Sequence, residues 1–128
     1  MEAKTHKLVL SIKPEFAEAI FAGEKTVEYR KQKPRENTNG IYIHVCGEDP
    51  AYVQGYAGCS GTTHGTPRAV WGTTKDQGAI TEEEFFDYFE DATNAYALRL
   101  FGAMRLVDPI PLSRLGLTRP PQSLAYAK

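Results

Sequence analysis

The junction between a helical pattern and a strand pattern at residues 23–30 constrains the fold of this 128-residue chain most strongly. Gly23 stands where the helix should end, because glycine readily adopts the left-handed conformation that terminates helices. In the extended segment that follows, side chains alternate between two faces, so Glu28 and Arg30 share one face. A strand that only filled a core would not carry a charged pair there. We therefore predict a recognition or reaction surface, with Lys25 beside it at the turn.

Composition restricts the class of protein. A chain of 128 residues with 41% hydrophobic and 24% charged residues predicts a single globular domain over residues 1–128. The early apolar run at residues 8–12 is too short for a membrane span or a signal peptide. Two cysteines are too few for a disulfide framework, so we expect a cytoplasmic protein without a membrane partner.

The charges are balanced overall but unevenly distributed. A net charge of −1 and a pI near 6.3 argue against a broad phosphate-binding surface, so any nucleic-acid contact should be local. Basic side chains concentrate in residues 25–35 and in the last third of the chain, whereas acidic side chains concentrate in residues 82–91. Two interpretations remain open: solvated helix and loop surfaces, or two basic segments on one rim of a cleft.

Hydrophobic periodicity predicts a chain in which strands dominate. Strands are expected over residues 7–12, 26–31, 53–57 and 95–101, with a further strand that begins at Gly40. A short helix should begin at Pro14 and end at Gly23. A second helix should follow Thr81, because Thr81 and Glu84 have the spacing of a capping box.

The middle of the chain is less regular. Residues 58–67 are rich in Gly, Ser and Thr without periodicity, which predicts a mobile loop, and residues 69–75 favour a helical turn around Trp71. The order of elements suits an α+β fold, a small, mixed, partly closed β-barrel with two to three short helices packed at its openings. Alternating βαβ units would need more helices than the pattern contains.

Residues 10–17, Ile20 and residues 23–30 together resemble the opening signature of the ASCH domain, a family of the PUA-like superfamily of small β-barrels. The most specific part is Gly-x-Lys-x-x-Glu-x-Arg at residues 23–30, and weaker similarity extends to Trp71, residues 78–89 and the C-terminal tail. The resemblance implies the predicted barrel. It also implies that RNA, a nucleotide or a modified nucleoside binds in a cleft between the first helix and the barrel.

The family also includes enzymes. One branch hydrolyses N4-acetylcytidine with a lysine, a threonine and a glutamate. Lys25 matches the lysine, but Glu28 occupies the position of the threonine, and Asp76 is the only acid near the position of the glutamate. The resemblance therefore does not carry this activity to the chain. Another branch has been linked to RNA cleavage, and no residue of the sequence singles that activity out.

The predicted ligand site has Lys25, Glu28 and Arg30 at its centre. An opposite charge favours the ionised form, so Glu28 should keep Lys25 protonated, as a clamp on a phosphate or carbonyl oxygen. Glu28 could accept a hydrogen bond from an exocyclic amine or a ribose hydroxyl while Arg30 holds it bidentately. The alternative is a structural ion-pair network at the barrel mouth. If the protein is an enzyme, Lys25 and Glu28 are the catalytic candidates.

Other residues complete the predicted site. Lys13 precedes the first helix and could point into the cleft, and Gln122 and Ser123 follow two prolines that fix their backbone. Trp71 is either a core residue or a platform on which a base stacks. Neither a metal nor a cofactor is predicted, because no paired metal motif is formed by His44, Cys46, Cys59 and His64.

We therefore predict a monomer or weak homodimer that binds RNA, a nucleotide or a modified nucleoside. The alternative is a small hydrolase that acts on an acylated nucleobase or on RNA phosphodiesters, and the sequence does not decide between binding and catalysis. A third possibility is an accessory protein whose ligand is another protein. The sequence also leaves open whether residues 58–67 close over a ligand.

Overall fold

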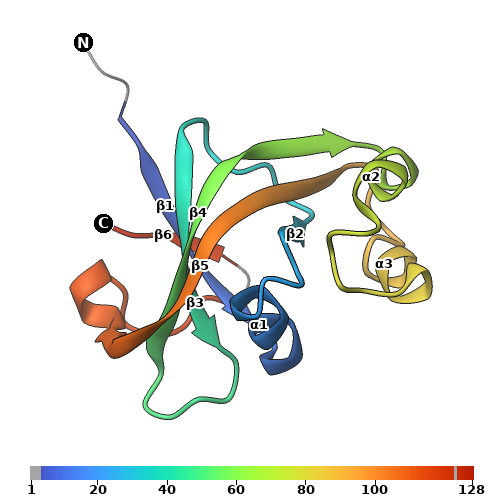
Figure 1. The fold of residues 1–128 in the computed structure, drawn as a ribbon. Helices are drawn as coiled ribbons and strands as arrows, with labels where there is room; N and C mark the ends of the chain where they lie inside the picture. Colours follow the sequence, from blue (N-terminus) through green and yellow to red (C-terminus); the bar gives the residue numbers. More distant parts are fainter. Residues whose placement is uncertain (1–3, 123) are drawn as a thin grey trace.

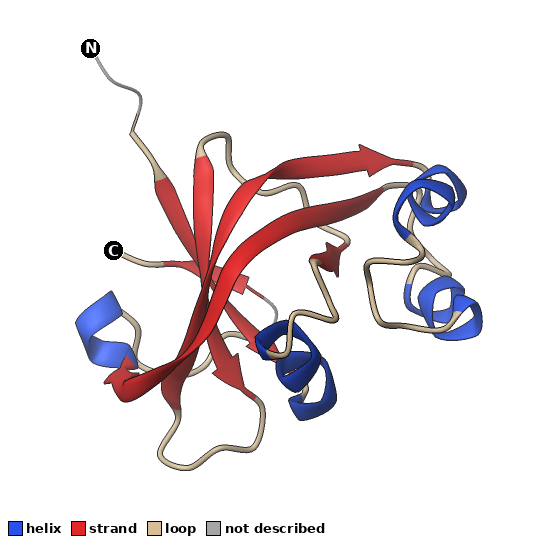
Figure 2. Cartoon of the chain, viewed as in Figure 1, coloured by secondary structure: helices blue, strands red, loops and turns tan. Residues whose placement is uncertain are grey.

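Six strands form one sheet, in the order β2-β5-β4-β3-β1-β6, within residues 4–122 and 124–128, which the structure describes. The strands are β1 (His6–Ile12), β2 (Val27–Arg30), β3 (Thr38–Val45), β4 (Tyr52–Gly65), β5 (Ala95–Pro111) and β6 (Leu124–Tyr126). The helices are α1 (Pro14–Phe21), α2 (Pro67–Thr74), α3 (Glu82–Tyr88) and a short 3-10 helix, η1 (Leu112–Leu115). In this computed structural model the sheet curls into a partly closed barrel with helices at its ends (Figures 1 and 2), which confirms the predicted fold class.

The first half of the chain is a crossover that places β2 at the edge of the sheet. β1 and β3 pair in parallel, from Leu8 with Ile41 to Ile12 with Val45, and parallel neighbours require a long connection. That connection contains α1 and β2. β2 pairs antiparallel with β5, so the charged strand predicted from the sequence is one edge of the sheet and β6 is the other. The curl of the sheet nevertheless brings Arg30 of β2 into contact with Ser11 of β1.

Two apolar clusters pack against the two faces of β2. The barrel interior contains the alternating residues of β1 and β3, such as Leu10 and Ile43, packed against Ala17 and Ile20 of α1. The second cluster joins the other face of β2 and β5 to α2 and α3, around the fully buried Phe85. Tyr29 belongs to this second cluster, so the two faces of β2 serve different environments, as the alternation of its side chains predicts.

The capping box predicted for α3 is confirmed. The Thr81 hydroxyl accepts a hydrogen bond from the backbone N–H of Glu84 at 3.1 Å, and the Glu84 carboxylate accepts from the backbone N–H of Thr81. Ile80 packs against the cluster that contains Phe85, as expected for the residue before the cap. The helical turn predicted at residues 69–75 is α2, which begins two residues earlier, with Thr66 as its N-cap.

The prediction of a mobile loop over residues 58–67 is wrong. β4 continues to Gly65 and pairs with β5, for example Cys59 with Leu100 and His64 with Tyr96. The register of this pairing is irregular, which erases the simple alternation that identifies strands in sequences. Packing also favours glycine here, because a Cβ on Gly58 would lie 2.6 Å from Cε1 of Phe101 and would displace that exposed ring. β5 likewise runs ten residues beyond its predicted end at Phe101.

Within the described part of the chain, none of the helices combines the length and hydrophobicity needed to cross a bilayer.

Candidate functional site

The turn between α1 and β2 holds Lys25 in place through its backbone. Gly23 has a φ of +79°, the left-handed conformation expected at the end of this helix. The backbone N–H of Lys25 donates to the carbonyl of Ala19 at 3.0 Å, and that of Thr26 donates to the carbonyl of Gln77 at 2.8 Å. The start of β2 is therefore attached both to α1 and to the segment before α3.

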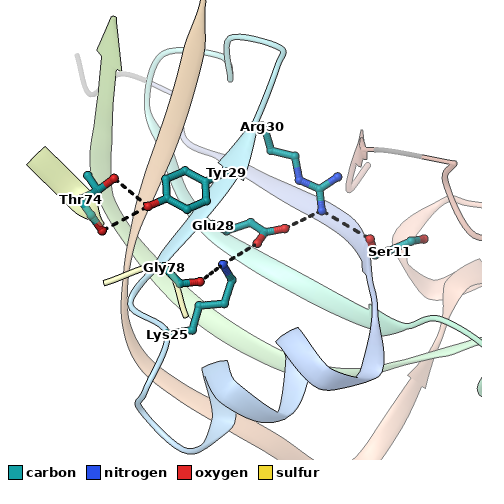
Figure 3. A network of polar contacts seen from close by, with 7 residues as sticks. All are labelled: Ser11, Lys25, Glu28, Tyr29, Arg30, Thr74 and Gly78. Atoms are coloured by element: carbon teal, nitrogen blue, oxygen red, sulfur yellow. Dashed lines mark hydrogen bonds and ion pairs between the residues drawn. The ribbon is translucent and has the colours of Figure 1, made fainter. Parts of the chain in front are cut away.

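Lys25, Glu28 and Arg30 form a buried ionic network. Lys25 is only 3% exposed, and its Nζ donates to the carbonyl oxygen of Gly78 at 2.7 Å. The same Nζ lies 3.5 Å from Oε1 of Glu28. The other carboxylate oxygen of Glu28 accepts from Nη2 of Arg30 at 2.7 Å, and this nitrogen also donates to the carbonyl of Ser11 at 3.4 Å (Figure 3). Glu28 thus bridges two cations.

Burial sets the direction in which the pKa of Lys25 shifts. Removal from water lowers the pKa of Lys25 below its ordinary 10.5, the charge and hydrogen bond of Glu28 raise it, and the charge of Arg30 lowers it further. The net direction is downward. Glu28 does not set the direction of the shift, because the nearly complete exclusion of water outweighs one carboxylate, and the expectation that Lys25 keeps its proton stays a prediction. The rings of Phe16 and Tyr29, 5.3 and 5.2 Å from Nζ, surround the ammonium with aromatic faces.

A cavity of about 530 Å³ opens beside this network. Its walls come from β1, α1, β2 and α3, and its lining consists of Ser11, Ile12, Lys13, Phe16, Lys25, Glu28, Tyr29, Arg30, Ile80, Glu84, Asp87 and Tyr88. We call this hollow the first cavity. It brings together four of the six predicted ligand-binding residues.

The charges that line the first cavity are balanced. Three cations, Lys13, Lys25 and Arg30, are matched by three carboxylates, which are Glu28 and, from the acidic helix α3, Glu84 and Asp87. The basic residues of the last third of the chain do not line it. Of the two interpretations left open for the charge clusters, two basic segments on one rim does not hold for this cavity, because the C-terminal segment does not reach it while α3 packs against β2.

Three further sequence predictions have different outcomes. Gln122 is exposed and does not line the first cavity, and Ser123 lies outside the described residues. Trp71 is half-buried, packs against Phe85 and Phe86 with ring centroids 5.0 and 6.1 Å away, and lines neither cavity, which favours a packing role over a platform for a base. Asp76, the acid nearest to the missing glutamate of the deacetylating branch, is exposed and does not line the cavity either.

The histidines and cysteines do not gather. Cys46 and Cys59 are free thiols, and burial raises the pKa of Cys59, which disfavours the nucleophilic thiolate. Across the described residues, no three His, Cys, Asp or Glu side chains lie close enough to hold a metal ion.

A second cavity, of about 410 Å³, was not anticipated from the sequence. It lies between the β2–β3 connection and the paired ends of β4 and β5, and is lined by Lys33, Pro34, Arg35, Glu36, Asn37, Thr38, Gly61, Thr62, His64 and Tyr96. Its basic residues belong to the cluster noted in the sequence. Thr62 and His64 fall in the segment for which the sequence predicts a loop. The pairing of β4 with β5 places them beside Tyr96, and local sequence patterns do not reveal that pairing.

Comparison with known proteins agrees with this architecture. The family model described as ASCH domain matches residues 10–96. A protein of Zymomonas mobilis subsp. mobilis named ASCH domain-containing ribonuclease is 31% identical over 125 residues, covering 94% of this chain and 83% of its own length.

Solved structures show the same similarity. The crystal structure of ASCH from Zymomonas mobilis superposes with a TM-score of 0.80 at 31% identity, covering 95% of this chain and 87% of that chain. A tyrosine-to-phenylalanine variant of ZmASCH, from the same organism, gives a TM-score of 0.80 and covers 90% of its chain. With a family match over most of its length and a relative at this identity, the chain belongs to the ASCH domain family.

Proposed function

We propose that this protein binds RNA and that the first cavity receives a nucleotide against Lys25, Glu28 and Arg30. The observation that carries the proposal is the ionic network in the cavity wall, where Lys25 and Glu28 are buried and Arg30 is half-buried. Such a network adds little to stability, because removing charges from water is costly, and this favours a role in binding. The name of the Zymomonas relative, a ribonuclease, supports RNA as the ligand.

The composition of the first cavity suits a nucleotide. Its volume of about 530 Å³ falls among those of small-molecule sites. Ile12, Phe16, Ile80 and Tyr88 provide apolar and aromatic surface for the face of a base. The carboxylates can accept hydrogen bonds from base amines or a ribose hydroxyl, while the cations can hold a phosphate or carbonyl oxygen.

Lys25 and Arg30 would contribute differently. An ammonium has three N–H donors, and two of those on Lys25 are directed to Gly78 and Glu28, which leaves one for a ligand oxygen. Arg30 is oriented by Glu28 and by the carbonyl of Ser11, so its guanidinium would meet a phosphate in a fixed direction. Because the network already orders these two long side chains, ligand binding would cost less side-chain conformational entropy.

Binding of a fluorescent single-stranded octaribonucleotide, followed by anisotropy, tests this proposal. Lys25→Met and Arg30→Gln should each weaken binding by about tenfold or more, as expected for lost hydrogen bonds to charged groups. Lys75→Met is the matched control, because Lys75 is exposed and lines neither cavity. Equal affinities for the wild type and both cavity variants, with thermal unfolding showing folded proteins, would refute the proposed site.

A second candidate function is cleavage of RNA at the same place. It is favoured by a lysine whose pKa burial lowers, next to a carboxylate, in the wall of the first cavity. Glu28 would accept the proton of a ribose 2′-hydroxyl while the 2′-oxygen bonds to phosphorus. The bond from phosphorus to the 5′-oxygen would break, and the Lys25 ammonium would protonate the leaving oxygen. The products would be a 2′,3′-cyclic phosphate and a 5′-hydroxyl end.

Product analysis separates binding from cleavage. The wild type would convert a short RNA to cyclic-phosphate products. Lys25→Met would lower the cleavage rate by about 10²-fold or more, while the variant would still bind RNA at saturating protein. Intact RNA after prolonged incubation with the wild type would leave the binding proposal alone standing. N4-acetylcytidine serves as a further substrate in the same assay, and we expect no deacetylation because no acid occupies the required position.

A further inference from the structure

The two cavities are neighbours on one face of the sheet. Residues directly opposite in antiparallel strands project their side chains to the same side. Arg30 of β2 is opposite Tyr96 of β5, and Tyr96 is opposite His64 of β4, so these side chains form a row across three strands. Arg30 lines the first cavity, whereas Tyr96 and His64 line the second. One step along the row therefore leads from one cavity to the other.

A parallel row repeats this arrangement one step along the strands. Glu28 is opposite Leu98, and Leu98 is opposite Thr62. Glu28 again lines the first cavity and Thr62 the second, with the buried Leu98 between them. Leu98 belongs to the apolar cluster of the barrel interior, so packed side chains close the sheet face between Glu28 and Thr62. The two hollows therefore approach each other along the row of Arg30, Tyr96 and His64.

Tyr96 and His64 offer a stacking surface. Their rings lie 6.0 Å apart between centroids with only 17° between their planes, so their faces point the same way. Tyr96 is half-buried and His64 is exposed, so the pair is anchored on one side and open to solvent on the other. Aromatic faces of this kind bind successive bases of single-stranded nucleic acids without regard to sequence.

The opposite wall of the second cavity is basic and well ordered by hydrogen bonds. Lys33 and Arg35 contribute two cations against the single carboxylate of Glu36. The backbone N–H of Arg35 donates to the hydroxyl of Tyr126 at 2.7 Å, and the guanidinium of Arg35 lies 3.9 Å from the centroid of the Tyr126 ring. The carbonyl of Arg35 accepts from the hydroxyl of Thr38 at 2.6 Å. Figure 1 shows this connection between β2 and β3 running beside the extended ends of β4 and β5.

We propose that the second cavity binds the nucleotide next to the one in the first cavity, so that the ligand is a single-stranded RNA segment and not a free nucleoside. A base stacks on Tyr96 and His64, and its phosphate lies near Lys33 and Arg35. A duplex would not serve, because its bases are already stacked on each other. This inference rests on the proposed function and extends it from one nucleotide to a strand.

Affinities for an octaribonucleotide and for a single labelled nucleotide test the inference, using the full chain. Tyr96→Ala should weaken octanucleotide binding by about tenfold or more, the loss expected for one stacked base, and should leave mononucleotide binding unchanged. Tyr96→Phe should restore octanucleotide binding, because it keeps the ring. Tyr56→Ala is the matched control: Tyr56 is half-buried, stands on β4 against another tyrosine, and lines neither cavity.

The outcomes distinguish this inference from the proposed function. Octanucleotide binding that is weakened by Arg30→Gln but not by Tyr96→Ala would overturn the second cavity and leave the first. Octanucleotide binding that is weakened by Tyr96→Ala but not by Lys25→Met or Arg30→Gln would overturn the proposed nucleotide site in the first cavity and support the one in the second. No octanucleotide binding by the wild type would overturn both. If Tyr96→Ala unfolds, Tyr96→Leu and His64→Ala carry the test, with the same expected loss.

Discussion

Lys25 holds an ammonium group where water is almost absent, and several contacts around it partly compensate for the lost hydration, whereas the charge of Arg30 opposes it. Glu28 supplies the opposite charge, the Gly78 carbonyl accepts a hydrogen bond, and two aromatic rings flank the nitrogen. Removing one partner of such a network usually costs more than replacing the whole network with apolar groups. The stability of the protein should therefore depend on the protonation state of Lys25 and on the position of the Gly78 carbonyl.

The pH dependence of stability should reveal the buried lysine. Because the pKa of Lys25 is lowered in the folded protein, the unfolded chain binds more protons just below pH 10.5. The contribution of Lys25 to the free energy of unfolding should thus rise toward pH 10.5 and be lost as the pH falls through the folded pKa. In urea unfolding, the stability of the wild type relative to Lys25→Met should increase with pH.

The comparison is cleanest below pH 10.0, the ordinary pKa of tyrosine. Burial raises the pKa of Tyr29, so ionisation of tyrosine in the unfolded chain lowers stability above that pH, which is the opposite sign. A stability difference between wild type and Lys25→Met that does not change with alkaline pH would show that the lysine is not buried as described.

Gly78 should tolerate no side chain. A Cβ at this position would lie 2.6 Å from the hydroxyl oxygen and 2.8 Å from Cζ of the buried Tyr29. We expect Gly78→Ala to lower the free energy of unfolding by about 1–3 kcal/mol, as overpacking does, and to displace the carbonyl that holds Lys25. Gly72→Ala is the control, because a Cβ there meets nothing within 4 Å and α2 should gain up to about 1 kcal/mol. Denaturant unfolding measures both.

At the scale of elements, α3 is both a core helix and a wall of the first cavity. Its Phe85 fills the second apolar cluster, while Glu84, Asp87 and Tyr88 line the cavity. The helix has only seven residues, too few to be stable alone, so its cap and its packing must hold it against β2.

Loss of the cap should therefore affect both stability and binding. Thr81→Ala should lower the free energy of unfolding by about 0.5–2 kcal/mol, because the N–H of Glu84 loses its acceptor. Thr81→Ser keeps the hydroxyl and should remain near the wild type. Thermal unfolding provides the measurement, and equal melting temperatures for the alanine and serine variants would contradict a stabilising role for the capping box.

At the scale of the whole molecule, a net charge of −1 means that RNA attraction cannot come from an overall positive field. Binding must depend on a few local contacts, and its salt dependence should be shallow. Each phosphate contact to a single strand contributes about 0.7 to the slope of log K against log salt concentration.

Two arginine substitutions separate local contact from total charge. Arg35→Met should reduce the salt slope of octanucleotide binding by about 0.7, the contribution of one phosphate contact. Arg114→Met changes the net charge equally, but Arg114 is exposed on η1 and lines neither cavity, so its slope should match the wild type. Equal reductions in both variants would indicate a long-range effect of charge and not a contact in the second cavity.

The parts of the fold predictable from sequence were those encoded by near neighbours. The alternation of β1, the helix from Pro14, the left-handed Gly23 and the Thr81 capping box each depend on residues a few positions apart. The common face of Glu28 and Arg30 follows from the same local geometry, and the structure places both in one network with Lys25. That these residues bind a ligand remains a prediction.

The sequence alone determined several elements of this ASCH domain, such as β1, α1, β2 and α3, and the placement of three charged side chains around one turn, because dihedral preferences and side-chain alternation act over a few residues. Tertiary structure decided the rest: the strand formed by residues 58–65, the acidic wall that α3 adds to the first cavity, and the second cavity beside Tyr96. These features arise from contacts between distant segments, such as His64 with Tyr96, whose pairing depends on how the whole sheet curls. Burial, which lowers the pKa of Lys25 despite a neighbouring carboxylate, is likewise a property of the assembled fold.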